Sequence, residues 1–192
     1  MQKNRFEIDG DNRVEWERLQ RIDARAASGI YFQNILPQVV RHHREAAPTG
    51  SRCDLLLSIM GLSPETTVLV TAFLRPQRLV IVSSRNAGQY CEQALAFLAE
   101  HELLLRSAVA VRYVDATNHN ELYKTLRSEL DAEPGRWMVD LTGGKKIMSA
   151  VAGYTAWGLG LPVCYLESRA YNEQMRRPDP GSEEIIIYEP PS

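Results

Sequence analysis

Residues 142–146, Thr-Gly-Gly-Lys-Lys, combine residue types that favour the binding of an anion. Glycine lets the backbone turn sharply and lets a ligand approach without meeting a Cβ atom. The threonine hydroxyl and the lysine side chains supply hydrogen-bond donors and positive charge. We expect the preceding Asp140, a lone carboxylate, to brace the glycine turn. This combination predicts a site for phosphate groups.

The residues on either side place the glycines between a strand and a helix. Residues 137–139 form a short apolar run that is typical of a strand. Behind the lysines, Ile147, Ala150, Val151 and Tyr154 recur at the spacing of a helix that lies on a core. The free N–H groups and the positive dipole end of that helix favour an anion. The alternative is that the glycines only solve a steric problem and the lysines only solvate the helix start.

Two common phosphate motifs do not fit this segment. A P-loop needs a glycine where Val139 stands and a serine or threonine where Lys146 stands. The dinucleotide fingerprint follows a strand, whereas Gly158 and Gly160 lie at the end of the predicted helix. The sequence therefore predicts neither an ordinary ATPase nor a nicotinamide enzyme.

The composition is that of a soluble protein with one substantial core. The chain has 192 residues, 44% of them hydrophobic, and a formal net charge of −2, which argues against a surface that coats DNA. No apolar run is long enough to span a membrane and no signal peptide is recognisable, so we expect a cytoplasmic location. The three cysteines are far apart and predict reduced core residues rather than a metal site, and all four histidines are expected at the surface.

Two regions are expected along the chain. Residues 1–50 predict a short helical N-terminal appendage, with a first helix capped by Asp11 or Asn12 and ending near Gly29, and a second over 31–46. Residues 51–192 alternate strands and helices. Strands are expected at 55–59, 79–82, 108–114, 137–139, 163–166 and 184–188, and helices at 64–74, 89–100 and 121–130 and from 147.

Nearly continuous apolar strands separated by helices are typical of a parallel sheet covered on both faces. Right-handed crossovers then give a Rossmann-like three-layer α/β/α sandwich. The last two strands have no helix between them, which predicts an antiparallel C-terminal edge. The fold class is therefore α/β, with a mostly parallel sheet.

In such a sheet ligands bind beyond the carboxyl ends of the strands, where the strand order reverses. Three loops are expected to open there and to form a cleft, and they lack the acidic pairs that hold Mg²⁺ and a Ser-His-Asp constellation. The candidate ligand-binding residues are Gly61, Leu62, Ser63, Ser83, Arg85, Asn86, Thr142, Gly143, Gly144, Lys145 and Lys146.

The strand-Gly-Leu-Ser-Pro-helix segment at 55–74 and the strand-Asp-Leu-Thr-Gly-Gly-Lys-Lys-Ile-Met-helix segment from residue 137 resemble the CARF (CRISPR-associated Rossmann fold) family. The resemblance covers about residues 54–188. It implies a homodimer whose shared pocket binds a cyclic oligoadenylate, the second messenger of type III CRISPR systems, with cyclic tetra-adenylate matching the two-fold symmetry. It implies no cofactor, no metal, no DNA partner and no membrane partner.

The resemblance also implies roles for individual residues. Ser63 and Lys146 face the ribose-phosphate ring and are the candidate catalytic residues. Thr142, Gly143 and Gly144 donate to phosphate, and the loop of residues 83–86 lies nearer the bases.

Family members usually join this domain to an effector, and this chain departs from that pattern. The helical ribonuclease effector carries an arginine four to six residues before a histidine, and residues 41–44, Arg-His-His-Arg, have the wrong spacing. Arg112 and His119 have a permitted spacing but fall at the end of a strand. The chain is then either the sensor half of a larger effector, fused or separate, or a ring nuclease that slowly cleaves the messenger without a metal.

Two alternatives come from other classes. In a nucleotide-independent interaction module the glycine corner would be structural only. A phosphoribosyl-type transferase ranks last, because the acidic pair that precedes its phosphate loop is missing.

Overall fold

The computed structural model describes residues 8–46, 52–173 and 177–190. The chain divides into two compact units, one of residues 1–48 and 167–184 and one of residues 49–166 and 185–192. Residues 167–184 thus cluster with the N-terminal helices, and the second unit holds most of the sheet.

The main sheet has six strands in the order β3-β2-β1-β4-β5-β8. The pairs β1–β2, β1–β4, β2–β3 and β4–β5 are parallel, and β8 forms the antiparallel edge beside β5. This confirms the predicted Rossmann-like class. The strands are β1 (Leu55–Met60), β2 (Arg78–Ser84), β3 (Val109–Val114), β4 (Trp137–Asp140), β5 (Val163–Ser168) and β8 (Glu183–Tyr188).

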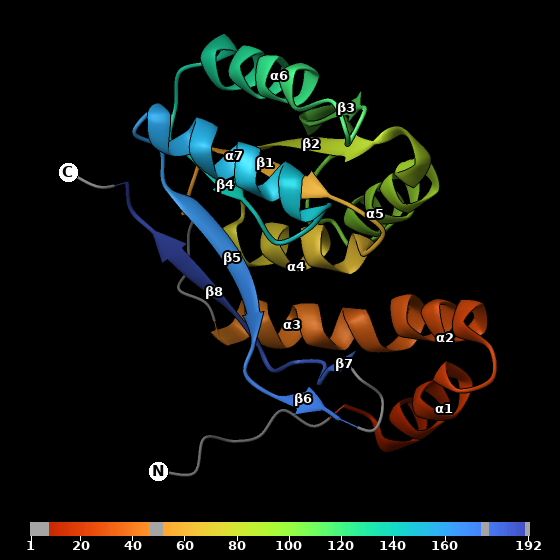
Figure 1. Ribbon diagram of the computed structural model, residues 1–192. Coiled ribbons are helices and arrows are strands. Elements are labelled where there is room, and N and C mark those ends of the chain that lie inside the picture. Colours follow the sequence, from red (N-terminus) through yellow and green to blue (C-terminus); the bar gives the residue numbers. More distant parts are fainter. Residues whose placement is uncertain (1–7, 47–51, 174–176, 191–192) are drawn as a thin grey trace. The chain divides into compact units, whose positions relative to one another are not determined.

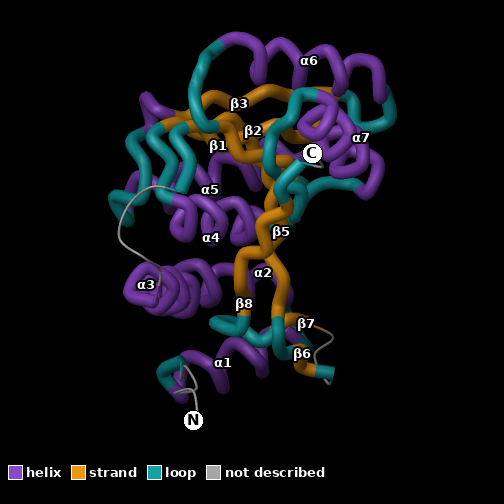
Figure 2. Tube along the Cα trace, turned by 90° about the vertical axis from the view of Figure 1, so that its left-hand side faces the viewer, coloured by secondary structure: helices purple, strands orange, loops and turns teal. Residues whose placement is uncertain are grey.

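Helices cover both faces of the sheet in the second unit (Figures 1 and 2). On one face lie α6 (His119–Ala132) and α7 (Lys146–Gly158), and on the other lie α4 (Pro64–Leu74) and α5 (Gly88–Glu100). Short 3-10 turns, η2 (Arg85–Ala87) and η3 (Arg106–Ala108), lead into α5 and β3.

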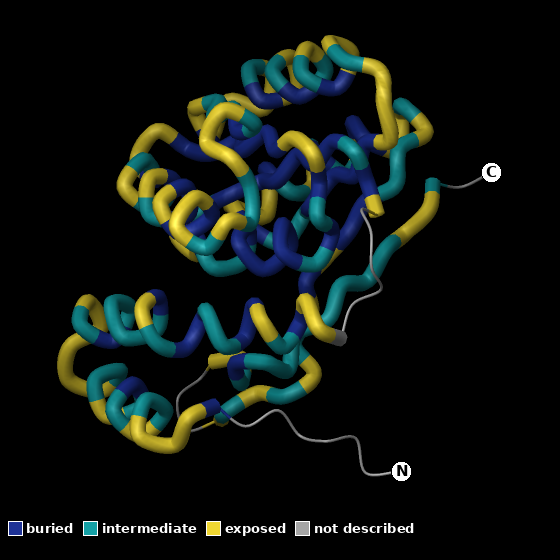
Figure 3. The backbone as a smooth tube through the Cα atoms, turned by 180° about the vertical axis from the view of Figure 1, so that it is seen from behind, coloured by how far each residue is buried: buried dark blue, intermediate teal, exposed yellow. Residues whose placement is uncertain are grey.

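The central strands are buried along their whole length, as the dark blue segments of Figure 3 show. Every residue of β1 and of β4 is buried, as is every residue of β2 except the first. Side chains alternate between the two faces of a strand. Leu55, Leu57 and Ile59 therefore join the core beneath α6 and α7, whereas Ser58 contacts Thr67 of α4. The buried strands fix the positions at which the loops begin.

The N-terminal helices differ from the prediction in their caps and in one break. α1 (Gly10–Gln20) is capped by Asp9, not by Asp11 or Asn12, and α2 (Ala24–Ile30) is capped by Asp23. Each aspartate accepts two backbone N–H groups, so Asp23 starts a new helix where one continuous helix is predicted. The π-helix η1 (Tyr31–Ile35) and α3 (Leu36–Ala46) together match the predicted second helix.

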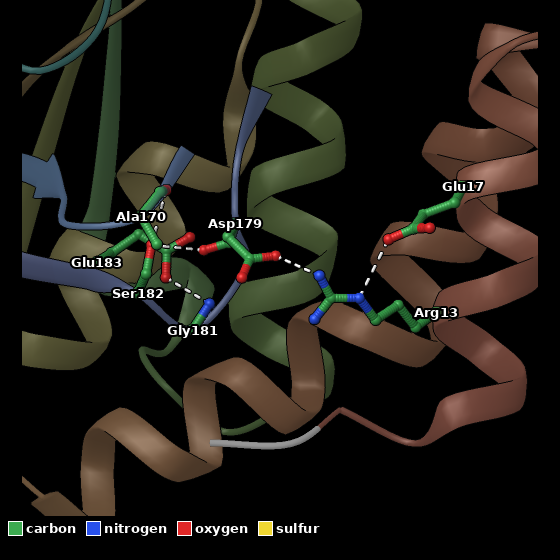
Figure 4. Close-up of polar contacts among 7 residues, drawn as sticks. All are labelled: Arg13, Glu17, Ala170, Asp179, Gly181, Ser182 and Glu183. Carbon is green, nitrogen blue, oxygen red and sulfur yellow. Dashed lines mark hydrogen bonds and ion pairs between the residues drawn. The ribbon is translucent and has the colours of Figure 1, made fainter. Parts of the chain in front are cut away.

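Polar contacts join α1 and α3 to residues 179–183 within the first unit. Arg13 of α1 donates from Nε to Glu17 at 3.1 Å and from Nη2 to Asp179 at 2.6 Å (Figure 4). His43 lies 3.3 Å from the Glu183 carboxylate and is buried, which corrects the prediction that every histidine lies at the surface. The two-stranded sheet β6–β7 (Tyr171–Asn172 and Arg177–Pro178) belongs to the same unit.

Candidate functional site: a glycine corner at the strand switch point

The carboxyl ends of β1 and β4 lie side by side at the place where the strand order reverses. From β1 the chain continues to β2 and β3 on one side, and from β4 it continues to β5 on the other. Open α/β sheets bind ligands at this kind of switch point. The loop from Gly61 to Ser63 and the loop from Leu141 to Lys145 both begin here, because Ser58 of β1 pairs with Asp140 of β4. We call these two loops together the glycine corner.

The chain packs tightly against itself at the three glycines. A Cβ atom on Gly61 would lie 3.0 Å from Cα of Gly144, and one on Gly143 would lie 2.4 Å from the carbonyl oxygen of Ile59. Gly144 also has a φ of +78°, and its Cβ would lie 2.6 Å from Cγ2 of Ile59. Close packing against the end of β1 is therefore by itself a sufficient reason for glycine at positions 143 and 144.

The buried Asp140 carboxylate holds this turn in place through hydrogen bonds, as the sequence predicts. Its Oδ1 accepts hydrogen bonds from the backbone N–H of Thr142 at 2.9 Å and from the Thr142 hydroxyl at 2.5 Å, and its Oδ2 accepts from Ser58 Oγ at 2.6 Å. The Thr142 hydroxyl in turn accepts the N–H of Leu166 at 2.8 Å. Burial raises the pKa of the Asp140 carboxyl, and the hydrogen bonds from Ser58 and Thr142 oppose that rise.

The sequence reasoning missed the rest of this buried network. Ser58 lies within hydrogen-bond distance of Thr67 in α4, at 3.0 Å, so the network links β1, β4, α4 and β5. The feature of the sequence that could have predicted this network is a single serine inside the otherwise apolar strand Leu-Leu-Leu-Ser-Ile-Met. A buried hydroxyl in such a strand needs a polar partner.

Two long helices begin at the glycine corner without a side-chain cap. Ser63 occupies the N-cap position of α4, as predicted, but its hydroxyl makes no capping hydrogen bond, and Lys145 at the same position of α7 makes none either. By contrast, Asn118 caps the first turn of α6. The first turn of α7 contains no acidic residue and carries the partial positive charge of an uncapped helix end, which favours an anion. In α4, by contrast, Glu65 places a negative charge in the first turn.

The cations of the three loops divide into two groups. Lys145 and Lys146 are exposed, and no hydrogen bond or ion pair joins the Lys146 side chain to another described residue. Arg85 instead forms an ion pair with Glu121 of α6 at 2.9 Å. Hydrogen bonds from Thr117 lower the pKa of the Asp115 carboxyl, and the charges of Arg85 and Lys145 add to this effect. Among the cations of these loops, Lys146 thus has no hydrogen-bond or ion-pair partner in the described part of the chain.

The remaining predicted residues lie at different depths. Leu62 is 65% exposed and presents an apolar surface beside the exposed Ser63. Ser83 is fully buried and its hydroxyl donates to the carbonyl of Met60 at 3.0 Å, so it bridges β2 to β1 and does not reach the surface with Arg85. Asn86 is exposed in the turn before α5.

Within the described part of the chain, no group of three or more His, Cys, Asp or Glu side chains could hold a metal ion. Arg112 of β3 forms an ion pair with Glu129 of α6 at 2.6 Å, so its charge takes part in the packing of α6 on β3.

Among the helices described, none has the length and apolar character needed to cross a membrane.

No protein-family model matches the sequence, and no curated protein matches it significantly. Solved structures do match it in fold. Can2 from Sulfobacillus thermosulfidooxidans, in complex with cyclic tetra-adenylate, matches with a TM-score of 0.50 and 18% identity over 59% of this chain and 32% of Can2. Csm6 from Enterococcus italicus, bound to cyclic hexa-2'-fluoro-hexa-dAMP, matches with a TM-score of 0.49 and 10% identity over 60% of this chain and 34% of Csm6.

An O-methyltransferase family protein from Burkholderia thailandensis matches with a TM-score of 0.46 and 11% identity over 92% of this chain and 63% of that protein. At 18% identity the likeness to Can2 concerns the fold alone. The matched region is about a third of Can2 and of Csm6.

Proposed function

We propose that this protein binds a cyclic oligoadenylate, cyclic tetra-adenylate in particular, at the glycine corner of a homodimer. In this proposal it acts as a sensor in a type III CRISPR response. The ring of phosphates would lie against the start of α7, where Lys146 supplies charge and the first helical turn supplies N–H donors. Ser63 would contact the ribose, and Leu62 would contact a base.

One observation carries the proposal. The loops after β1 and β4 meet at the strand switch point, and α7 begins there without a side-chain cap. Lys146 is exposed on the first turn of α7, and no hydrogen bond or ion pair joins its side chain to another described residue. The resemblance of both loops to the CARF family and the likeness in fold to Can2 support the choice of ligand. A structural glycine corner accounts for the glycines. It gives no role to the uncapped start of α7 or to Lys146, whose side chain has no hydrogen-bond or ion-pair partner among the described residues.

Cleavage of the ligand would be a separate step at the same place. The 2′-hydroxyl of a ribose attacks its own 3′-phosphate, the bond from phosphorus to the 5′-oxygen breaks, and the products are a 2′,3′-cyclic phosphate and a 5′-hydroxyl. The protein's part is to hold the ribose in line and to stabilise the charged phosphorane, with Ser63 and Lys146 in these roles. Neither loop contains a histidine or glutamate as a general base, so we expect slow turnover.

A thermal-shift panel tests the binding proposal. The panel compares cyclic tetra-adenylate and cyclic hexa-adenylate with linear tetra-adenylate, NAD and ATP, because a ligand that binds only the folded state raises the melting temperature. We expect the largest rise with cyclic tetra-adenylate. A melting temperature that none of the adenylates moves would favour the nucleotide-independent module.

Incubation with labelled cyclic tetra-adenylate in EDTA then separates the sensor from the ring nuclease. Linear product with a 2′,3′-cyclic phosphate end would assign cleavage to this chain. Intact ligand after hours would leave binding alone.

A further inference from the structure

Two carboxylates, those of Asp115 and Glu121, are held by the loop that leads from β3 into α6. Asp115 follows β3 directly, and its backbone N–H donates to Oε2 of Glu121 in the first turn of α6 at 3.3 Å. The side chain of Asn118 accepts the N–H of Glu121 at 3.1 Å. These hydrogen bonds fix both carboxylates at the carboxyl end of β3, at the same edge of the sheet as the glycine corner. We call the two residues the Asp115–Glu121 pair.

The Asp115–Glu121 pair faces two of the cations of the candidate site. Oε1 of Glu121 accepts a hydrogen bond from Nη2 of Arg85 at 2.9 Å. The pKa of the Asp115 carboxyl is lowered by hydrogen bonds from Thr117 and, to a smaller extent, by the positive charges of Arg85 and Lys145, so both cations lie near this carboxylate. Negative charge of the protein therefore already balances Arg85 and Lys145.

The formal charges around the glycine corner cancel and do not leave a strong positive field. Glu65 in the first turn of α4 adds a further carboxylate. A phosphodiester brings a single negative charge, whereas a nucleoside triphosphate concentrates several negative charges on adjacent phosphate groups. Such a concentration needs cations nearby that carboxylates do not already balance. The positive charges come from Arg85, Lys145 and Lys146, and the negative charges come from Glu65, Asp115 and Glu121.

We infer that the Asp115–Glu121 pair determines specificity: it disfavours nucleoside triphosphates at the glycine corner and leaves the binding of phosphodiester ligands almost unchanged. A triphosphate would need Arg85 and Lys145 as well as Lys146 to balance its charge, and the pair competes for the first two. A phosphodiester needs only Lys146 and the N–H groups in the first turn of α7. Proteins commonly discriminate between related ligands by placing a repulsive group against the competitor.

The inference deepens the proposed function, because it names the chemical class of phosphate that the glycine corner accepts, and it rests on that function for the identity of the accepted ligand. The exclusion of triphosphates depends on the charges alone. The side chain of Arg85 is 68% exposed and that of Glu121 is 30% exposed, so their ion pair lies in contact with water and is weak. The pair should therefore reduce the affinity for a triphosphate without abolishing its binding.

Titration calorimetry with ATP and with cyclic tetra-adenylate tests the inference, at low ionic strength and in EDTA, because salt and Mg²⁺ would screen the charges. The variant Asp115→Asn/Glu121→Gln removes both negative charges but keeps the size and an acceptor oxygen of each side chain, and circular dichroism checks its fold. We expect it to bind ATP at least about 10-fold more tightly than the wild type does, with the affinity for cyclic tetra-adenylate changed less than about 3-fold. The matched control is Glu100→Gln/Asp131→Asn, which removes the same charge from the ends of α5 and α6 that are distant from the glycine corner.

The outcomes separate this inference from the proposed function. A gain in ATP affinity that is confined to Asp115→Asn/Glu121→Gln would establish the exclusion of triphosphates. An equal gain in the control variant, an equal gain for cyclic tetra-adenylate, or no gain at all would overturn it. If ATP affinity rises in Asp115→Asn/Glu121→Gln although no form of the protein binds a cyclic oligoadenylate, the proposed function fails while the exclusion stands.

Discussion

Gly61 and Gly144 lie in contact across the ends of β1 and β4, so that a Cβ atom on Gly61 would lie 3.0 Å from both Cα and N of Gly144. The two loops of the glycine corner therefore fix each other's position, and neither can shift alone. The contact brings together the end of the loop before α4, where Ser63 lies, and the loop that leads into α7, which begins at Lys146.

Replacing Gly144 with alanine should destabilise the protein by about 1–3 kcal/mol. The new methyl group would meet Ile59 at 2.6 Å, and the positive φ of +78° adds backbone strain. Urea unfolding followed by circular dichroism measures the change. Gly158→Ala is the matched control, because nothing lies within 4 Å of its Cβ position, and it should stay within about 0.5 kcal/mol of the wild type. Equal stability of the two variants would contradict the packing described here.

Because Ser63 makes no capping hydrogen bond, its replacement should reduce stability less than replacement of Asn118, which caps α6. The asparagine side chain accepts the N–H of Glu121 at 3.1 Å, so Asn118→Ala should cost about 1 kcal/mol of stability. The Ser63 hydroxyl makes no capping bond, so Ser63→Ala should cost less than about 0.5 kcal/mol and yet weaken binding of cyclic tetra-adenylate. Chemical unfolding and titration calorimetry give the two quantities. A large loss of stability in Ser63→Ala with unchanged affinity would assign the residue to the fold alone.

Lys146→Ala should weaken the binding of cyclic tetra-adenylate about 10- to 100-fold, because a hydrogen bond to a charged group contributes about 1.5–3 kcal/mol. Stability should change little, since the side chain is exposed and no hydrogen bond or ion pair joins it to another residue that the structure describes. Lys124→Ala, at an exposed lysine of α6, is the control of equal charge. If both variants bind like the wild type, Lys146 is not part of the site.

Much of the sheet could be predicted from the sequence, because its strands are buried on both faces. Residues 55–60 and 137–140 contain almost only apolar side chains, and Pro64 and Gly144 mark the turns that follow. The boundary of α4 follows from Ser63 and Pro64 at its start. The strand order comes from the structure, because right-handed crossovers alone do not say after which strand the order reverses.

The details that failed depend on contacts between residues far apart in sequence. His43 is buried because Glu183, 140 residues later, lies beside it, and no local pattern reports that. Ser83 has the residue type of a loop ligand, but β2 extends through it and its hydroxyl bonds to Met60. Asp9 and Asp11 are equally good caps by type, and the choice between them is made by the tertiary position of α1.

The buried Asp140 carboxyl predicts an unusual dependence of stability on pH. Because burial raises its pKa above the ordinary value of 3.8, the folded state holds this proton more tightly than the unfolded chain. Between the two pKa values the folded state binds more protons, so the contribution of Asp140 to stability falls as the pH rises and stays low above the folded pKa. Asp140→Asn carries no titrating group and keeps an oxygen that can accept the hydrogen bonds of Thr142.

Urea unfolding of the wild type and of Asp140→Asn across about pH 2 to 8 measures this dependence. The wild type should lose stability relative to the variant as the pH rises. Asp115→Asn gives a control of opposite sign: hydrogen bonds from Thr117 lower the pKa of the Asp115 carboxyl, so its contribution is present above 3.8 and is lost as the pH falls through the lowered pKa. Parallel curves for the wild type and Asp140→Asn would show that Asp140 stays ionised beneath the glycine corner, held by Ser58 and Thr142 against the cost of burial.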